Sequence, residues 1–241
     1  SNYTNPLVIA GAGPTGVELA CKLSDLVKNK VEIFLVDKGN RILSKSKSFN
    51  REKAINAISE RNIKIFLGNY IESINENNIY LAPIDSERKD SSKINCSGLF
   101  WTAGLRPYHL KLVDHFLDEN KKIQVNQFLQ INEYQNIFFV GDIVCCADYP
   151  FPSSAQVAMQ QGFLTAQNII SLRKGQKLKS FQFEDLGEML SLGMGNASIT
   201  GYGVTLAGPI AFKIRYLAYL MRMPGLFLPL KSAGSRLFSK K

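Results

Sequence analysis

The sequence predicts an α/β fold with a parallel sheet and a dinucleotide site, from three features of its first 37 residues. An apolar run, Leu7-Val8-Ile9-Ala10, is typical of a buried strand, and a G-x-G-x-x-G motif follows it directly. The residues after the motif place apolar side chains at helical spacing, which indicates a helix packed on that strand. A second apolar run, 31–36, ends in Asp37, where a carboxylate that accepts the ribose hydroxyls of NAD is expected.

The three glycines of the motif, Gly11, Gly13 and Gly16, each meet a separate steric requirement. The first allows a tight turn out of the strand, the second lets the backbone approach a pyrophosphate, and the third lets the helix pack closely. The helix N-terminus that follows, with Pro14 and Thr15, favours negative charge, so we expect the pyrophosphate there. The alternative is a Gly-rich turn in an unrelated α/β protein.

The remaining predicted elements follow in order along the chain. We expect a helix near 49–61, short strands at 63–67, 70–74 and 79–81, a strand at 94–101, a strand at 137–140 and a helix at 154–172. The strand at 137–140 runs into Gly141 and Asp142, which places a carboxylate at the strand end where α/β sheets bind ligands. These elements predict a nucleotide-binding domain at 1–104, a second segment at 105–175 and a C-terminal region at 176–241.

Composition and charge narrow the classes of protein. A chain of 241 residues with 45% hydrophobic residues is typical of a folded globular protein, which excludes a disordered or fibrous one. Residues 173–241 carry 11 Lys and Arg against 3 Asp and Glu, so the excess positive charge lies in the C-terminal region. Such asymmetry predicts contact with an anionic surface, and a membrane fits better than nucleic acid because no nucleic-acid motif is present.

The residues 176–241 also change in character. The run 189–212 has no charged residue, which is long enough for a membrane span, but its glycines and Pro209 favour strands and turns instead. The next segment, 213–223 (KIRYLAYLMRM), places Lys and Arg beside bulky apolar and aromatic side chains. This pattern predicts an interfacial segment that lies on a bilayer. The alternative is a C-terminal helix docked on the body of the protein or on a dimer partner.

Cysteines and histidines give no metal site. The chain has Cys21, Cys96, Cys145, Cys146, His109 and His115, without a C-x-x-C motif or any metal-ligand spacing. We therefore expect a reducing compartment, buried thiols and no bound metal. The adjacent Cys145 and Cys146 leave two interpretations open, a redox pair or packing in a core.

Five motifs together resemble a known family. GAGPTGVELA (11–20), Asp37, WTAGLRP (101–107), FFVGDI (138–143) and SAQVAMQQG (154–162) are similar to the later part of type II NADH:quinone oxidoreductases. The tail most resembles the cyanobacterial and plastid branch, which reduces plastoquinone or demethylphylloquinone. The resemblance implies a Rossmann-like flavoprotein with two dinucleotide-binding domains, of which this chain holds part. It implies an NADH dehydrogenase of electron transport that uses FAD, takes hydride from NADH, or alternatively NADPH, and reduces a quinone without pumping protons.

The resemblance also implies roles for individual residues. It assigns NAD(P)H binding to Gly11, Gly13, Pro14, Thr15, Gly16, Asp37, Ala103 and Gly104, and FAD binding to Gly141, Asp142, Ala155 and Gln156. Glu18 matches a family glutamate near the contact of nicotinamide and flavin. Its alternative role is an acidic side chain in the first helical turn that complements the dipole.

Two glutamines form the expected quinone side of the site. Gln156 and Gln160 lie four residues apart on one helical face and can donate hydrogen bonds to a quinone carbonyl. The alternative is that they brace the helix.

The chain departs from the family at its start. The family begins with a separate strand, Gly-rich turn and helix that bind the ADP half of FAD, and this chain has only the unit that matches the NADH site. We therefore expect a fragment of a peripheral, monotopic enzyme on the cytoplasmic side of a membrane, with a homodimer left open. The alternatives are a relative of the pyridine nucleotide-disulfide or sulfide oxidoreductases, or a non-catalytic NAD-binding remnant.

Overall fold

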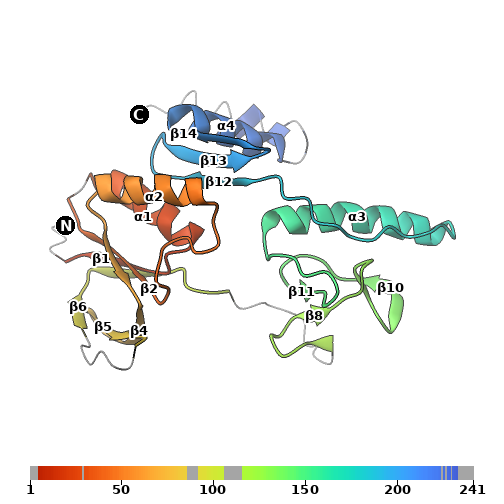
Figure 1. Cartoon of the computed structure of the whole chain (residues 1–241), viewed down its shortest axis with the longest axis horizontal. Helices are drawn as coiled ribbons and strands as arrows, with labels where there is room; N and C mark the ends of the chain where they lie inside the picture. The colour runs from red at the N-terminus through yellow and green to blue at the C-terminus, as the bar shows by residue number, and fades with distance from the viewer. Residues whose placement is uncertain are drawn as a thin grey trace. The chain divides into compact units, whose positions relative to one another are not determined.

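The chain divides into two compact units, which the computed structural model in Figure 1 shows as a ribbon. The structure describes residues 5–28, 30–85, 92–105, 116–223, 225, 227–228 and 230–232. The first unit combines residues 1–104 with 187–241, and the second unit comprises residues 105–186. The sequence placed its boundaries after residues 104 and 175, whereas here the chain returns to the first unit at residue 187.

A parallel sheet forms the centre of the first unit. Its strand order is β3 (Lys64–Leu67), β2 (Ile33–Asp37), β1 (Leu7–Ala10) and β7 (Gly98–Trp101). The helices α1 (Pro14–Val27) and α2 (Ser48–Glu60) pack on one face, where Ile9 and Leu35 are fully buried. This arrangement confirms the predicted α/β class with a parallel sheet.

A smaller antiparallel sheet covers the other face. It contains β4 (Asn69–Asn75), β5 (Asn78–Pro83) and β6 (Ser92–Asn95). Val8, Phe34 and Val36 of the central sheet pack against Ile79 and Leu81 of β5. Successive side chains of a strand point to opposite faces, and both faces of the central sheet are covered. Its strands are therefore almost wholly apolar.

The prediction of a single strand at 94–101 is wrong, because this segment contributes to two strands, β6 and β7 (Gly98–Trp101). The main chain turns at Cys96 and Ser97, whose N–H groups donate to Asn77 and Pro6. Residues before the turn form β6 and pair with β5, while residues after it form β7 and pair with β1. The change of partner between two sheets divides a run that is continuous in hydropathy.

The second unit is built around one long helix. Helix α3 (Ala155–Arg173) begins after Ser154, whose hydroxyl accepts a hydrogen bond from the N–H of Val157 at 3.3 Å. Two short pairs accompany it: β8 (Ile123–Gln124) with β11 (Val144–Cys145), and β9 (Gln130–Ile131) with β10 (Tyr134–Phe138). The strand predicted at 137–140 is therefore displaced, since β10 ends at Phe138 and pairs with β9 in an antiparallel direction.

The C-terminal residues of the first unit form a sheet and a helix. The strands β12 (Glu188–Ser191), β13 (Ala197–Gly201) and β14 (Val204–Ala207) precede helix α4 (Pro209–Met221). Leu190 and Leu192 are buried in the core that α1 and α2 form with the central sheet. The uncharged run is thus strand and turn up to residue 208, as its glycines predicted, and its last four residues begin α4. Within the described ranges, no helix has both the length and the apolar character needed to cross a membrane.

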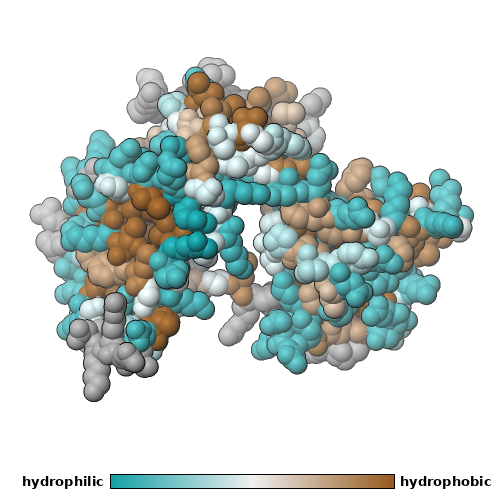
Figure 2. Space-filling model, viewed as in Figure 1, coloured by the Kyte–Doolittle hydropathy of each residue, from teal (hydrophilic) through white to brown (hydrophobic). Residues whose placement is uncertain are grey.

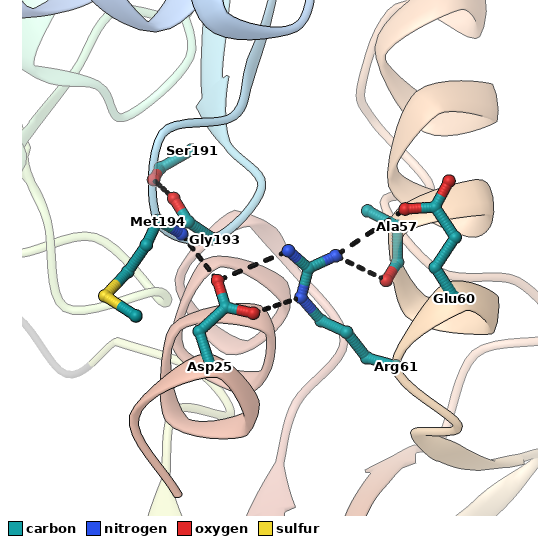
Figure 3. A network of polar contacts seen from close by, with 7 residues as sticks. All are labelled: Asp25, Ala57, Glu60, Arg61, Ser191, Gly193 and Met194. Carbon is teal, nitrogen blue, oxygen red and sulfur yellow. Dashed lines mark hydrogen bonds and ion pairs between the residues drawn. The ribbon is translucent and has the colours of Figure 1, made fainter. Parts of the chain in front are cut away.

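A carboxylate and a guanidinium join this C-terminal sheet to both helices (Figure 3). Asp25 of α1 accepts hydrogen bonds from Arg61 Nε at 2.8 Å and Nη2 at 3.3 Å, and from the N–H of Met194 at 2.6 Å. Arg61, which directly follows α2, also donates to the carbonyl of Ala57 at 2.9 Å. One partly buried pair therefore holds α1, the end of α2 and the turn between β12 and β13.

A second polar contact holds the other end of α2 to the same sheet. Asn50 is fully buried, and its amide donates to the carboxylate of Glu188 at 2.9 Å. Its carbonyl accepts a hydrogen bond from the hydroxyl of Thr200 at 3.0 Å. Because each polar group is paired, the sheet docks on α2 without leaving these buried groups unsatisfied.

We expect Asp25→Ala to lower the free energy of unfolding by about 2 kcal/mol at pH 7, because it removes the carboxylate partner of the partly buried Arg61 guanidinium. Burial opposes ionisation of Asp25, but the hydrogen bonds from Arg61 and Met194 and the charge of Arg61 outweigh it and lower the pKa of Asp25. The contribution is therefore complete above the ordinary pKa of about 3.9 and is lost as the pH falls through the lowered value.

Urea unfolding of both proteins at pH 7 and pH 3 measures this difference, which shrinks at pH 3. Glu52→Ala is the control, since the ion pair of Glu52 with Lys53 is exposed and contributes little. An Asp25→Ala loss no larger than that of the control would contradict the role of the pair.

Candidate functional site

The turn between β1 and α1 leaves no room for side chains at two of its glycines. Gly11 has φ of +103°, a conformation that residues with a Cβ rarely adopt, and its N–H donates to Val36 at 2.7 Å. A Cβ on Gly16 would lie 1.8 Å from the carbonyl oxygen of Gly11. The hydroxyl of Thr102 closes the arrangement by donating to Ala10 at 2.7 Å.

The N-terminus of α1 is open to an anion. Gly13 is the N-cap in an extended conformation, no side chain caps the helix, and a Cβ on Gly13 would meet nothing within 4 Å. Pro14 occupies the first helical turn, and both Pro14 and Thr15 are exposed. The unpaired N–H groups of this turn and the helix dipole can therefore bind a phosphate group.

Asp37 is held in a fixed orientation beside this turn. Its two carboxylate oxygens accept hydrogen bonds from the N–H groups of Ala12 and Gly39, both at 2.6 Å. Each oxygen keeps a further lone pair for an external donor. The carboxylate is thus prepared to receive two hydroxyl groups, as the ribose of a nucleotide presents.

A cavity of about 430 Å³ lies beside Gly11 and Asp37, at the carboxyl ends of the strands. Its lining residues are Ala10, Gly11, Val36, Asp37, Lys38, Asn69, Tyr70, Ile71, Trp101, Ala103 and Gly104. Four predicted cofactor-binding residues, Gly11, Asp37, Ala103 and Gly104, therefore line one pocket. The position agrees with the general rule that open α/β sheets bind ligands outside the carboxyl ends of their strands.

The pocket also contains residues that the sequence did not identify. Asn69, Tyr70 and Ile71 belong to β4 of the smaller sheet, and no sequence signal connects them with the glycine motif. Trp101 ends β7, and its indole N–H donates to the carbonyl of Ala103 at 3.0 Å. Its signal was its place in the WTAGLRP motif, of which Arg106 and Pro107 lie outside the described residues.

Glu18 lies beyond the first turn of α1, because the helix begins at Pro14. This position corrects the expectation that Glu18 belongs to the first helical turn. Its carboxylate accepts hydrogen bonds from the N–H of Ser191 at 2.7 Å and from Arg215 Nη2 at 3.2 Å. These contacts join Glu18 of α1 to β12 and α4. The role of Glu18 beside a nicotinamide stays a prediction.

In the second unit, Gly141 and Asp142 lie next to the helix α3. Gly141 has φ of +86°, and its N–H donates to the side-chain oxygen of Gln161 at 2.7 Å. Asp142 is exposed. Gln161 is fully buried, and its side-chain nitrogen has no hydrogen-bond partner within the described part of the chain. Sequence reasoning missed Gln161, whose signal was its place as the third glutamine of SAQVAMQQG.

Gln156 and Gln160 bind the main chain of the segment that follows α3. Gln160 accepts from the N–H of Glu184 at 3.0 Å and donates to its carbonyl at 2.8 Å. Gln156 accepts from the N–H of Leu186 at 2.9 Å. Asn168 forms a similar pair of bonds with Lys179, so side-chain amides of α3 hold the extended segment in place. In this structure the two glutamines brace the segment 184–186.

The cysteines do not favour thiol chemistry. Cys21, Cys96, Cys145 and Cys146 are all free thiols. Burial, together with a hydrogen bond to Asp118 and the charge of that carboxylate, raises the pKa of Cys145 to about 11. A thiol that stays protonated is a poor nucleophile, and Cys146 is buried in the core of the second unit. Core packing accounts for Cys146, and a hydrogen bond to Asp118 holds the partly exposed Cys145. His109 and His115 lie outside the described residues.

Comparison with known proteins gives a consistent set of similarities. The family described as pyridine nucleotide-disulphide oxidoreductase matches residues 2–162. Demethylphylloquinone reductase NdbB of Synechocystis is 32% identical over 223 residues, which cover 90% of this chain and 54% of the relative. Type II NADH:quinone oxidoreductase of Staphylococcus aureus is 30% identical, over 86% of this chain and 53% of the relative. The chain spans about half the length of these curated relatives.

A solved structure shares the fold. The structure of NDH2 from Plasmodium falciparum in complex with NADH has a TM-score of 0.79 at 15% identity, covering 91% of this chain and 62% of that chain. At this identity the likeness shows the fold alone. Together with the curated relatives, it confirms the predicted fold class and the resemblance drawn from the sequence motifs.

Two substitutions separate the two functions of the glycine motif. We expect Gly16→Ala to lower the free energy of unfolding by about 2–4 kcal/mol, because its Cβ overlaps the Gly11 carbonyl. We expect Gly13→Ala to change stability by less than about 1 kcal/mol, since its Cβ meets no atom, and to weaken dinucleotide binding at least about tenfold by blocking the close approach of phosphate.

Denaturant unfolding and calorimetric titration with NADH measure the two effects. Equal destabilisation by both substitutions would contradict the close packing at Gly16. Unchanged affinity in Gly13→Ala would show that no phosphate approaches this turn.

Proposed function

Because the chain belongs to the pyridine nucleotide-disulphide oxidoreductase family, we propose that it functions in an FAD-dependent NAD(P)H:quinone oxidoreductase. The glycine turn with its oriented Asp37 carries the proposal, since it offers groups that suit the pyrophosphate and a ribose of a nicotinamide dinucleotide. The curated relatives named as quinone reductases support the electron acceptor. They match over most of this chain, but the chain spans about half of their length.

The first unit binds and orients the hydride donor in this proposal. The N–H groups at the start of α1 receive the pyrophosphate, while Gly13 allows its close approach. Asp37 accepts hydrogen bonds from the ribose hydroxyls. Ala103 and Gly104 line the same pocket, and the positive φ of Gly104 allows a tight turn of the main chain at this point.

Asp37 favours NADH over NADPH, because its negative charge repels the 2′-phosphate of NADPH. Lys38 lines the same pocket and opposes this preference, since an ammonium group can bind that phosphate. The fixed bonds from Ala12 and Gly39 keep the carboxylate facing the ribose, so we propose that NADH is the better donor.

The residues of the second unit fit the flavin end of the reaction. Gly141 and Asp142 lie at a turn with an exposed carboxylate, and Gln161 presents an unsatisfied buried nitrogen beside it. The first turn of α3 contains Ala155 and Gln156, and the positive end of the helix dipole there favours an anionic group. These residues would hold part of an FAD molecule. Bound FAD supplies the acceptor for hydride and the donor of electrons to the quinone.

Gln156 and Gln160 remain our candidates for the quinone side, with Glu18 as a candidate near the nicotinamide. A side-chain amide nitrogen carries two N–H groups, and Gln160 uses one of them on the carbonyl of Glu184, so the second can donate to a quinone carbonyl. Gln156 binds Leu186 through its oxygen, which leaves this bond intact when its nitrogen donates to a quinone. The quinone is plastoquinone, demethylphylloquinone or a similar lipid-soluble compound.

The outer face of α4 suits contact with a membrane. Ile210, Ile214, Leu217 and Met221 are exposed at helical spacing, and Lys213 lies between them. Hydrophobic residues gather over α4 in Figure 2. Apolar side chains beside a basic residue are typical of a helix that lies in an anionic interface. We propose that the protein is peripheral, on the cytoplasmic side of a membrane, with a homodimer contact as the alternative use of this face.

We expect the 241 residues alone to bind NADH, to hold FAD weakly and to show little quinone reduction. A flavin pyrophosphate needs a second Gly-rich turn, and the G-x-G-x-x-G of this chain is assigned to NADH. Fusing a flavin-binding unit of the kind with which the family begins should restore yellow colour and NADH:quinone activity together, with NADH preferred to NADPH at least about tenfold.

Absorbance spectra and steady-state assays of both proteins measure these properties. A tightly bound, stoichiometric FAD in the 241-residue chain would show that the glycine motif binds the other nucleotide. A fused protein that binds FAD and oxidises NADH without reducing any quinone would contradict the proposed acceptor.

We expect Leu217→Gln to lower binding to anionic lipid vesicles about tenfold, because one exposed apolar side chain no longer enters the interface. Leu26→Gln is the matched control, since Leu26 lies on α1 and both leucines are 57% exposed. Higher salt should weaken binding of the unchanged protein without abolishing it, as only the electrostatic attraction is screened. Co-sedimentation measures both effects, and equal losses in the two variants would favour a docked helix.

A further inference from the structure

The exposed indole of Trp101 lines the pocket beside Asp37. We propose that Trp101 is a binding residue that stacks against the adenine ring of the nicotinamide dinucleotide. This inference rests on the proposed function, because it assumes that the pocket beside Asp37 receives a nucleotide. It adds a base-recognition surface to a site whose other groups contact phosphate and ribose.

The register of the sheet explains why Trp101 lines the pocket. Val36 pairs with Ala10, and Ala10 pairs with Trp101, so the three residues form a row across the carboxyl ends of β2, β1 and β7. Directly paired residues of neighbouring strands project to the same face of a sheet. The row therefore lies on the face covered by the smaller sheet, and all three residues line the cavity.

The indole has a fixed position and a free surface. Its N–H donates to the carbonyl of Ala103 at 3.0 Å, which restricts rotation of the ring. Trp101 is nevertheless 59% exposed, so its side chain contributes little to the core. A ring that is held by a hydrogen bond and left open to solvent is preorganised for a ligand, since little side-chain freedom is lost on binding.

The polar groups of the pocket identify which half of the dinucleotide meets this ring. Asp37 is oriented for the ribose hydroxyls, and the α1 N-terminus receives the pyrophosphate. The base attached to that ribose is adenine. Tyr70, 42% exposed, and Ile71 line the same cavity from β4, so a planar base has apolar and aromatic surfaces available on more than one side.

The chain contains one tryptophan, which makes its fluorescence a direct test. ADP-ribose is the probe, because it carries the adenine half without the nicotinamide, whose reduced form would quench by energy transfer without contact. We expect saturating ADP-ribose to change the emission of Trp101, and nicotinamide mononucleotide to leave it unchanged.

Substitution gives the second measurement. We expect Trp101→Ala to raise the calorimetric Kd for ADP-ribose about tenfold, as loss of a base-stacking ring does, while Trp101→Phe stays within about threefold. Phe100→Ala is the matched control. Phe100 precedes Trp101 on β7, is 39% exposed and points to the opposite face, so this variant should bind normally. All three variants should keep the unfolding temperature close to that of the unchanged protein.

The possible results separate this inference from the proposed function. ADP-ribose that binds without changing the emission, and with the same Kd in Trp101→Ala, would overturn the role of Trp101 and leave the nucleotide site intact. An emission change with nicotinamide mononucleotide in place of ADP-ribose would overturn the assignment to adenine. Failure of the unchanged protein to bind NADH and ADP-ribose would overturn both proposals.

Discussion

The close contact between Gly16 and the carbonyl of Gly11 determines the geometry of the first unit. Because a Cβ cannot be accommodated there, α1 starts directly against the strand that precedes it. This approach brings the helix N-terminus over the end of β1, beside Asp37 on β2 and Thr102 after β7. The pocket at the carboxyl edge exists because three neighbouring strands end beside one helix start.

The C-terminal sheet is attached to this unit mainly through paired polar groups around a small apolar centre. Leu190 and Leu192 enter the core, while Asp25 and Asn50 fix the ends of the contact by hydrogen bonds. Paired polar contacts of this kind specify one orientation of the sheet more strictly than apolar packing does. The same arrangement leaves the outer face of α4 apolar and free to meet another surface.

Local sequence predicted the parts of the site that depend on local geometry. The glycine turn, Asp37 and the helix predicted at 154–172 follow from spacing and periodicity, and the structure has each of them, the helix at 155–173. Tyr70 could not be predicted in the same way, because only the packing of two sheets brings β4 to the pocket. Gln161 lies in the SAQVAMQQG motif, but its burial depends on the turn at Gly141. The return of residues 187–223 to the first unit depends on long-range contacts that periodicity does not encode.

The ion pair between Glu18 and Arg215 changes the charge near the glycine turn, although neither residue lines the pocket there. Glu18 lies one turn of helix beyond the glycine turn, where an uncompensated carboxylate would repel an incoming pyrophosphate. Arg215 belongs to α4 and neutralises that charge at 3.2 Å. The C-terminal helix therefore supplies the positive charge that balances a carboxylate next to the proposed dinucleotide site. Removing α4 would leave a negative charge near the phosphates as well as deleting an apolar surface.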